Sequence, residues 1–444
     1  MDLAQNELLM IAEDESGEVE GEGRTPLISI LVVIFIIVAC SVATLPVWNY
    51  IVKAIGAVLA FAFLVRALRT QFKPCAEMLL YGTWALWCLA PLVAGLAYPL
   101  LFWEMWFTVV QIWALLLILS LCTDSKRVLS INLAAFIIAA VIVGGYSVLT
   151  GEYMRAETEQ KRVAGIALNA NSFAYRMLLG TIALAYLWMV QSRFRVMTKG
   201  FLIAIMAFFA IGVLVSGSRK AILGLALFYI LWVWFCYRKE MLHRPGMLLG
   251  ITLGLALGGL SFGMLLRGSL GEKRLLATYK MLSGEDTRGG GGERISLYKN
   301  AIAVFAEHPF VGVGLRGFSV RSGMHAITHS HSEIMEVATS SGIPGVVIYF
   351  GITVALWLRT SRILRHTGDP LVGKIVRLIR ASIVVLFLVA LGRDNYGSKE
   401  YWVVMASFIG YTNAVWQDLK GRGLYPSPSG TEDMYAPVSY AQYW

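Results

Sequence analysis

Long apolar blocks separated by short polar links run through most of this chain. Most blocks are about 17 to 22 residues long, the length of α-helix that crosses the hydrocarbon core of a bilayer. Membrane-spanning strands would instead give alternating segments of about ten residues. The pattern therefore predicts an all-α polytopic membrane protein with about 12 transmembrane helices. The predicted spans are residues 27–45, 47–65, 78–98, 102–122, 129–149, 171–191, 200–216, 220–237, 246–266, 342–358, 379–392 and 401–416.

Polar segments divide the chain into five expected regions. The first 26 residues carry eight acidic side chains and one arginine, which favours a disordered acidic tail over a signal peptide with its positive n-region. A polar segment of about 75 residues late in the chain is too long for a simple connection, so we expect it to fold as a cap. The regions are the tail 1–26, nine spans in 27–266, the cap 267–341, three spans in 342–416 and a second tail 417–444.

Helical periodicity also occurs within the predicted cap. The stretch "RISLYKNAIAVFAEHPF" places Ile295, Tyr298, Ile302 and Phe305 on one face of a helix, which we expect Pro309 to end. The stretch "EKRLLATYKML" precedes it and can form another helix. Between the two, "RGGGG" indicates a hinge. The cap is therefore predicted to be helical.

Lysine and arginine are concentrated in alternate loops, which gives the expected orientation. The positive-inside rule places these loops in the cytoplasm, among them a long loop at 359–380, and both termini fall on the same side. The polar regions left on the outer side are 150–170, 216–220, 267–341 and 393–400.

Composition agrees with a membrane protein. Hydrophobic residues make up 57% of the chain and charged residues only 15%, against about 25% charged residues in a soluble domain. The five cysteines lie in predicted spans or near cytoplasmic ends, so we expect no structural disulfide. The predicted spans contain almost no charge apart from Arg176 and Lys53 near their outer ends.

Arginines on the outer side run against the charge rule and are therefore candidates for function. Arg219 occupies a tight turn in "VLVSGSRKAILG", and Arg393 follows a span in "LGRDNYGSKEYW". Residues 267–331 hold nine basic against five acidic side chains, and Arg162 adds to this basic surface. A guanidinium carries a permanent charge and a bidentate fork suited to phosphate or pyrophosphate. The alternative is that these arginines extend to lipid headgroups.

Three of the six histidines fall in "HAITHSHSEIMEVATSSGIPG", residues 325–345. Ser330 and Glu333 fit a capping box, so His331 is predicted to be the first residue of a helix that Gly342 ends. A helix N-terminus disfavours positive charge, so a neutral His331 there is a candidate general base. The alternatives are solvated loop histidines or a metal site. No acidic partner set accompanies the histidines, and we expect no metal and no other cofactor.

The same segment fits the pattern H-[NSQ]-x9-G-x-x-G, formed by His331, Ser332, Gly342 and Gly345. This resembles the signature of the O-antigen ligase and polymerase superfamily. Further pieces are similar in the same order: "GIALNANSFAYRMLLG", "SGSRKAILGL" and "ERISLYKNAIAVFAEHPFVGVGLRGF". The resemblance covers roughly residues 165–345. The chain has "LNAN" where many relatives have a Pro–Asn pair, which bears on Asn169 and Asn171.

The resemblance implies a GT-C-like membrane glycosyltransferase of the bacterial inner membrane, with its active site and helical cap facing the periplasm. The implied donor is a glycan on undecaprenyl pyrophosphate and the implied acceptor is a sugar of the lipid A–core oligosaccharide. Arg219 and Arg294 would bind the pyrophosphate, and His331 would act as the base or position the acceptor. Further candidates for substrate contacts are Arg288, Arg316, Arg393, Arg162, Asn171 and Ser332.

The chemistry that this implies is direct displacement with inversion at the anomeric carbon. Pyrophosphate leaves readily once its charge is neutralised, so a metal ion is not required. One alternative is an O-antigen polymerase, which uses a second lipid-linked glycan as acceptor. A transporter is a second alternative, although transporters usually carry ionisable residues within their spans. Beyond these substrates the expected partner is the lipid bilayer, and no nucleic acid is expected.

Overall fold

The structure is a computed structural model that describes residues 26–42, 45–69, 74–152, 163–167, 169–190, 196–243, 291–322 and 330–424. Every regular element in these ranges is helical. The helices are α2 (Pro26–Ser41), α3 (Pro46–Arg69), α4 (Ala76–Trp87), α5 (Ala90–Val93), α6 (Pro99–Cys122), α7 (Lys126–Leu149), η1 (Gly165–Ala167), α9 (Ala170–Val190), α10 (Val196–Val215), α11 (Arg219–His243), α14 (Gly291–Glu307), α15 (Gly317–Arg321), α16 (Glu333–His366), α17 (Pro370–Ala390) and α18 (Lys399–Gly421).

The helices are those of a multi-pass membrane protein. Within the described residues, seven helical segments are long and apolar enough to cross a bilayer, and two shorter apolar helices lie at Ile28–Ser41 and Tyr50–Val65. The predicted span at 246–266 lies outside the described residues, whereas each of the other predicted spans overlaps a helix. The seven segments are Ala76–Val93, Pro99–Cys122, Lys126–Leu149, Ala170–Val190, Met197–Val215, Arg219–Arg238 and Glu333–His366.

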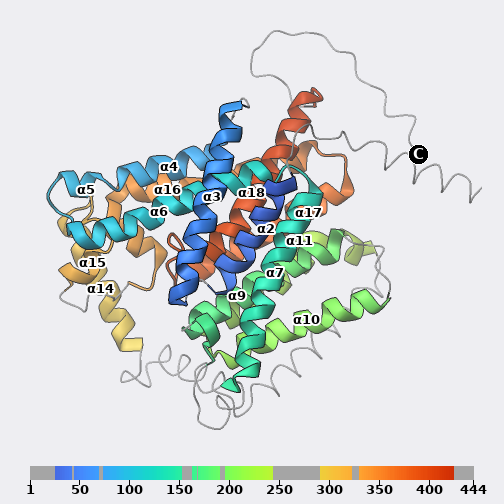
Figure 1. The fold of residues 1–444 in the computed structure, drawn as a ribbon, viewed down its shortest axis with the longest axis horizontal. Helices are drawn as coiled ribbons and strands as arrows, with labels where there is room; N and C mark the ends of the chain where they lie inside the picture. The colour runs from blue at the N-terminus through green and yellow to red at the C-terminus, as the bar shows by residue number, and fades with distance from the viewer. Residues whose placement is uncertain are drawn as a thin grey trace, which may run out of the picture.

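Helix α18 lies at the centre of the bundle. All residues from 401 to 412 are buried, and α2, α6, α7, α9 and α16 pack against the helix. Helices α4, α6 and α16 run alongside one another, and α3 crosses them at a steep angle (Figure 1). Helices α11 and α17 form another packed pair. A helix whose whole circumference is apolar or small can occupy such a central position.

The segment 359–380 was predicted to be a loop, but most of it is helical. Helix α16 continues to His366 and α17 begins at Pro370, so only three residues connect them. Asp369 caps α17, because its side chain accepts hydrogen bonds from the backbone N–H groups of Leu371 (2.7 Å) and Val372 (3.2 Å). The apolar pattern ends before the helices do because their connected ends carry lysines and arginines. Helix α18 likewise extends past the predicted end, to Gly421.

Two ion pairs among the described residues are enclosed within the bundle, and neither was predicted from the sequence. The carboxylate of Glu77 on α4 pairs with Arg359 on α16, whose Nη1 also donates to the carbonyl oxygen of Ile409 at 3.1 Å. Both side chains are buried, so the helical bundle encloses two charges that lie just outside the predicted spans. Glu77 and Arg359 were missed because each lies one residue beyond a predicted span. The second pair, Arg176 with Glu400, joins α9 to α18.

The described part of the cap contains α14 and α15. Helix α14 ends at Glu307, as Pro309 predicted, but the face that is buried differs from the one that the periodicity marked. Leu297, Ala301 and Val304 are the buried positions, whereas Ile302 is 53% exposed. The buried set packs against Val313, Phe318 and Met335, which lie outside the stretch used for the prediction. The predicted helix "EKRLLATYKML" lies outside the described residues.

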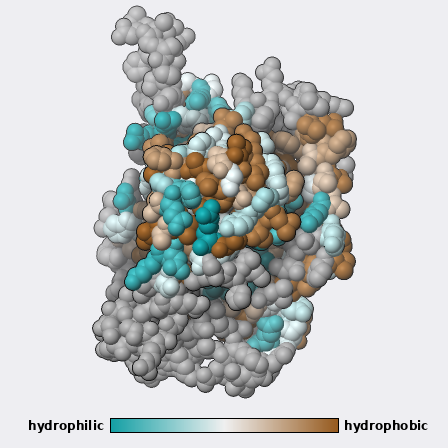
Figure 2. Space-filling view, turned by 90° about the vertical axis from the view of Figure 1, so that its left-hand side faces the viewer, coloured by the Kyte–Doolittle hydropathy of each residue, from teal (hydrophilic) through white to brown (hydrophobic). Residues whose placement is uncertain are grey.

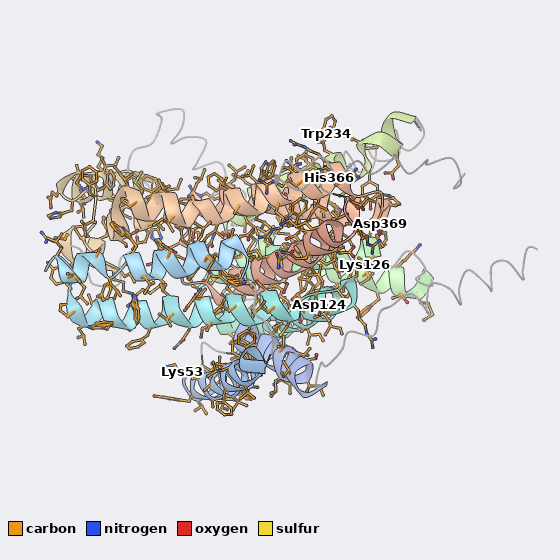
Figure 3. All side chains as sticks on the ribbon, turned by 90° about the horizontal axis from the view of Figure 1, so that it is seen from above. Lys53, Asp124, Lys126, Trp234, His366 and Asp369 are labelled. Atoms are coloured by element: carbon orange, nitrogen blue, oxygen red, sulfur yellow. The ribbon has the colours of Figure 1, made fainter. Side chains whose placement is uncertain are left out.

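The labelled charged residues show which ends of the helices lie together. His366, Asp369, Asp124 and Lys126 gather toward one end of the bundle (Figure 3), away from α14 and α15. All four belong to segments that the charge rule places in the cytoplasm. The five cysteines are buried and free. The orientation of the molecule in a membrane stays a prediction.

Candidate functional site

Helix α16 is kinked at Gly342, where the backbone leaves the helical region with φ 66° and ψ −170°. A Cβ atom at this position would collide with the carbonyl oxygen of Phe310, so only glycine fits both the dihedral angles and the contact. Pro344 follows in the first turn of the second half, where its missing N–H costs little. Gly342 therefore interrupts the helix at the place where the sequence predicted its end.

The kink leaves backbone N–H and C=O groups of α16 without helical partners, and residues 309–314 form hydrogen bonds with them. The N–H of Val313 donates to the carbonyl oxygen of Thr339 at 2.7 Å, and that of Gly314 donates to Ser340 at 3.1 Å. In return, the N–H of Ile343 donates to Pro309 at 2.8 Å. The "HPFVGVG" stretch is thus clamped onto α16 by reciprocal backbone hydrogen bonds. We call residues 309–314 the clamp loop.

His331 does not begin the helix, which corrects the sequence prediction. The N-cap of α16 is Ser332, and Glu333 is the first helical residue. His331 precedes the cap with a left-handed backbone, φ 58°, and its side chain is half-buried. A non-glycine residue in this conformation costs about 1–2 kcal/mol and is held there by its surroundings.

The hydrogen bonds of Ser330 explain what holds His331 in this conformation. The predicted capping box between Ser330 and Glu333 does not form. Instead, the Glu336 carboxylate accepts hydrogen bonds from the backbone N–H of Ser330 at 3.0 Å and from its hydroxyl at 2.9 Å. Ser330 and Ser332 are both buried on either side of His331. The residue that carries the imidazole is therefore fixed from both sides.

Residues 391–398, between α17 and α18, contact several other helices, and we call them the hub loop. Arg393 donates from Nη1 to the carbonyl oxygen of Asn171 at 3.2 Å and lies 4.3 Å from the centre of the Tyr175 ring. Both partners belong to α9. Two predicted site residues, Arg393 and Asn171, are thus brought into direct contact.

The hub loop also meets the helices that carry the two predicted pyrophosphate arginines. The hydroxyl of Tyr298 on α14 donates to the carbonyl oxygen of Leu391 at 3.5 Å, and Arg294 lies one helical turn before Tyr298. Gly392 packs so closely on Lys220 that a Cβ atom there would lie 2.7 Å from the lysine Cδ. Arg219, the first residue of α11, directly precedes Lys220 and is half-buried.

A third side of the hub loop faces the start of α16. Asn395 lies beside the Glu333 carboxylate, which also accepts a hydrogen bond from the hydroxyl of Tyr349. Tyr396 faces Glu336 and Arg316, and its backbone carbonyl accepts a hydrogen bond from Tyr81 at 3.2 Å. Burial raises the pKa of Tyr396 well above its ordinary value, so its phenol is neutral. Glu333 follows His331 by two residues, so His331 is close along the chain to a residue that packs against the hub loop.

Many buried polar atoms around the hub loop have no hydrogen-bond partner among the described residues. Asn395 is fully buried, and neither its Nδ2 nor its Oδ1 has a hydrogen-bond partner of ordinary geometry among the described residues, although the amide lies beside the Glu333 carboxylate. The others are Tyr175 Oη, Arg176 Nη1, Arg316 Nε, Ser340 Oγ, Tyr396 Oη and Trp402 Nε1. An unsatisfied buried polar atom costs about 1–3 kcal/mol, so such a cluster is expected where water or a polar ligand binds.

Of the other predicted site residues, Arg316 and Ser332 lie in described segments and two more do not. Arg316 has a left-handed backbone, φ 59°, and its Nη1 lies 3.5 Å from Oε1 of Glu104. Ser332 is the buried N-cap of α16. Arg288 and Arg162 lie outside the described residues. Figure 2 views the molecule from the end that carries α5, α14 and α15, and shows hydrophilic side chains bordered by hydrophobic ones.

Sequence reasoning missed several side chains of this site. Glu336, Asn395 and Tyr396 were not predicted, and Glu333 was considered only as a helix cap. A signal was available for Glu333 and Glu336, because two carboxylates one turn apart begin an otherwise apolar helix. For Asn395 and Tyr396 the signal was weaker, since only the neighbouring Arg393 broke the charge rule.

Comparison with protein families identifies the segment that contains much of this site. The family model described as O-Antigen ligase matches residues 203–350, which include the start of α11, α14, the clamp loop and the kink of α16. Comparison with curated proteins gives no match.

Proposed function

Because residues 203–350 make this chain a member of the O-antigen ligase and polymerase superfamily, we propose that it is an O-antigen ligase. The family implies a membrane enzyme of the glycosyltransferase kind that acts on lipid-linked glycans. The proposed donor is a glycan on undecaprenyl pyrophosphate, and the proposed acceptor is a sugar of the lipid A–core oligosaccharide. The reaction takes place at the periplasmic face of the bacterial inner membrane, on a GT-C-like helical scaffold.

The observation that carries this proposal is the convergence of separate segments on the hub loop. The loop contacts Lys220 beside Arg219, Tyr298 one turn from Arg294, and Asn171 through Arg393. It also reaches Glu333, which follows His331 by two residues. Cationic side chains suited to a pyrophosphate and a histidine suited to proton transfer therefore come from elements around one loop.

The proposed reaction is a single displacement at the anomeric carbon. His331 takes the proton of an acceptor hydroxyl as the hydroxyl oxygen attacks that carbon from the face opposite the pyrophosphate. The bond between the anomeric carbon and the phosphate oxygen breaks, and undecaprenyl pyrophosphate leaves with the electron pair. The configuration at the anomeric carbon is inverted. Arg219 and Arg294 neutralise the charge that develops on the leaving group, as electrostatic stabilisation of this kind requires.

The left-handed backbone of His331 supports its assignment as the reacting histidine. A strained residue persists only where its surroundings fix it, and such residues are concentrated at functional sites. The fixing groups are the hydrogen bonds between Ser330 and Glu336. Because the N-terminus of α16 follows directly, its field favours the neutral imidazole that can accept a proton.

A reconstitution assay tests this proposal. Purified full-length protein in lipid vesicles is given a lipid-linked glycan together with either lipid A–core or a second lipid-linked glycan. A ligase transfers the glycan to lipid A–core, whereas extension of the second lipid-linked glycan would identify a polymerase. The assay is run in excess EDTA and repeated with added Mg²⁺. Transfer in neither acceptor arm, with protein that is folded and binds the donor, would overturn the proposed activity.

A further inference from the structure

The side chain of Lys220, the second residue of α11, lies along the hub loop. A Cβ atom built on Gly392 would lie 2.7 Å from Cδ of Lys220, 2.8 Å from its Cε and 3.1 Å from its Nζ. The ammonium group is therefore beside Gly392, the residue that directly precedes Arg393. Lys220 is half-buried, as is its neighbour Arg219. The hub loop thus meets a cation that the sequence did not single out for the site.

The face of α11 that carries Lys220 is turned toward other helices. One turn after Lys220, a Cβ atom at Gly224 would lie 2.7 Å from Cγ2 of Val389 on α17 and 3.2 Å from Cδ2 of Leu178 on α9. Residues four apart lie on the same face of a helix, so Lys220 is directed along the contact between α11 and α17. A lysine that extends to lipid headgroups would instead lie on a face that the bilayer contacts. The direction of Lys220 favours a role inside the protein.

The turn before α11 fixes where this helix starts. Gly217 has a left-handed backbone, φ 62°, and the N–H of Ser218 donates to Oγ of Ser216 at 3.1 Å. Both serines are buried. Successive residues of a helix point about 100° apart, so Arg219 and Lys220 leave the turn in different directions. The turn therefore presents two cations that are placed separately.

Two other cations near the hub loop join segments of the protein. Arg393 donates to the carbonyl oxygen of Asn171 at 3.2 Å, and Nη1 of Arg316 lies 3.5 Å from the Glu104 carboxylate. Each guanidinium therefore holds one segment of the chain against another. A lysine places a compact charge on a flexible stem, which can follow a change in the charge of a ligand. Lys220 is thus the cation at this loop whose chemistry suits such a change.

The proposed reaction creates one more negative charge than the donor carries. In the intact donor each phosphate of the pyrophosphate bears one negative charge, and Arg219 and Arg294 match these two charges. When the bond to the anomeric carbon breaks, the departing phosphate oxygen gains a further negative charge. A cation placed beforehand beside that oxygen lowers the barrier, because it interacts more strongly with the transition state than with the donor.

We propose that Lys220 is a further catalytic residue, which stabilises the charge that develops on the departing pyrophosphate, and that Gly392 gives its side chain room to lie at the hub loop. This inference rests on the proposed function, since it adds a residue to the same reaction. The electron pair of the broken bond goes to the phosphate oxygen, and the Lys220 ammonium keeps its proton throughout. Arg219 and Arg294 hold the donor, and Lys220 acts mainly as the bond breaks.

Lys220→Met tests this role, because methionine keeps an unbranched stem against Gly392 and removes only the charge. Three quantities are measured on the full-length protein: binding of the glycan-linked donor, binding of undecaprenyl pyrophosphate, and the transfer rate at saturating donor. We expect the last two to fall about 10–100-fold, the value of a charge-assisted contact, while donor binding changes less than about threefold. Lys126→Met, exposed at the opposite end of the bundle (Figure 3), is the control and should change none of the three.

Gly392→Ala tests the same role with the lysine still present. The backbone of Gly392 does not have a positive φ, and the new methyl group meets the flexible end of one side chain, so the fold should be kept while Lys220 is displaced. The saturated transfer rate should fall as in Lys220→Met. Lys220→Ala/Gly392→Ala should transfer no more slowly than Lys220→Ala, since the displaced group is already absent. Gly373→Ala on α17, whose Cβ would lie 3.8 Å from the Arg377 guanidinium, is the control.

The outcomes separate this inference from the proposed function. If the wild type transfers glycan and Lys220→Met does so equally fast, the inference is wrong and the function stands. If Lys220→Met weakens donor and undecaprenyl pyrophosphate binding equally and keeps the saturated rate, Lys220 binds the ground state and its catalytic role is overturned. Full activity of Gly392→Ala beside an impaired Lys220→Met would overturn the role of the glycine. If no acceptor is glycosylated but Lys220→Met selectively loses undecaprenyl pyrophosphate, the cation site stands and the proposed function fails.

Discussion

Nε of Arg176 on α9 donates a hydrogen bond to Oε1 of Glu400 on α18 at 2.7 Å. The side chains are 5% and 13% exposed, so each charge depends on the other. The pair fixes the first turn of α18, which directly follows the hub loop. An error in its position would therefore displace the hub loop and the candidate site around it.

Removing one member of this pair should destabilise the protein more than removing both. Arg176→Met leaves the Glu400 carboxylate buried without its cation, which costs about 3–5 kcal/mol. Arg176→Met/Glu400→Leu removes both charges and should recover much of that loss. Denaturant unfolding in detergent, followed by tryptophan fluorescence, measures the free energies of unfolding. Equal destabilisation in the single and double variants would show that the two charges are not coupled.

Gly342→Ala should disrupt the kink of α16. The methyl group would collide with the Phe310 carbonyl, and a left-handed backbone costs alanine about a further 1–2 kcal/mol. Gly351→Ala in the same helix is the matched control, because its methyl group would lie 3.6 Å from Leu80 in ordinary contact. That control should be neutral or stabilising by up to about 1 kcal/mol. A thermal unfolding scan that ranks the two variants equally would contradict the assigned role of the kink.

Asn395→Leu should reduce activity without reducing stability. The buried amide has no hydrogen bond of ordinary geometry, and only its weak contact with the Glu333 carboxylate is lost, so a leucine of similar size should leave the free energy of unfolding within about 1 kcal/mol of the wild type. If the amide contacts a substrate, glycan transfer should fall about 2–10-fold, the value of a neutral hydrogen bond.

Asn132→Leu provides the contrast for this variant. Asn132 is equally buried, but its Nδ2 donates to the Thr123 hydroxyl at 2.9 Å. Its replacement should therefore destabilise the protein and leave the transfer rate per folded molecule unaltered. Activity of Asn395→Leu at the wild-type rate would remove Asn395 from the candidate site.

His331 and Arg219 should affect different steps. His331→Asn suits the left-handed backbone that alanine would resist, and loss of a general base should lower the transfer rate about 10² to 10⁴-fold while donor binding is kept. Arg219→Ala should weaken donor binding by about 1.5–3 kcal/mol, and Arg219→Lys should recover only part of it, because an ammonium lacks the bidentate fork. Parallel measurement of binding and transfer checks the assignment. Near wild-type transfer by His331→Asn would contradict it.

Cysteine labelling tests the predicted orientation. Ala306, near the end of α14, and Gly368, between α16 and α17, are both exposed. In a cysteine-free variant, Ala306→Cys should react with a membrane-impermeant thiol reagent in cells with a permeabilised outer membrane, whereas Gly368→Cys should react only after lysis. The opposite pattern would reverse the periplasmic placement of the site.

The helices themselves were largely predictable, because apolar blocks of membrane length leave a strong signal in the sequence. The positions at which the helices begin and end were less predictable. The end of α16 and the start of α17 carry basic residues, so hydropathy ended both too early. The buried face of α14 differs from its periodic apolar face because the packing partners, Val313, Phe318 and Met335, come from other segments. A periodic pattern shows that a helix has an apolar face but not which of its apolar positions another segment covers.

The candidate site was predictable only in pieces. Outer arginines and the histidine segment were visible one at a time, and the family resemblance gave them common roles. Their arrangement depends on Leu391 meeting Tyr298, Gly392 meeting Lys220, and Arg393 meeting Asn171. These contacts join positions far apart in the sequence, and no local pattern specifies them. The left-handed backbone of His331 likewise depends on Glu336, five residues further along.

The central place of α18 has a consequence for how the protein is made. It follows every other described helix in the chain, yet residues 401–412 are enclosed on all sides. The earlier helices must therefore enter the membrane without the element that fills their centre, and they close around it only after its synthesis. Because the hub loop immediately precedes α18, binding competence would arise at this late step. A nascent chain that meets donor lipid in the membrane would be inert until its insertion is complete.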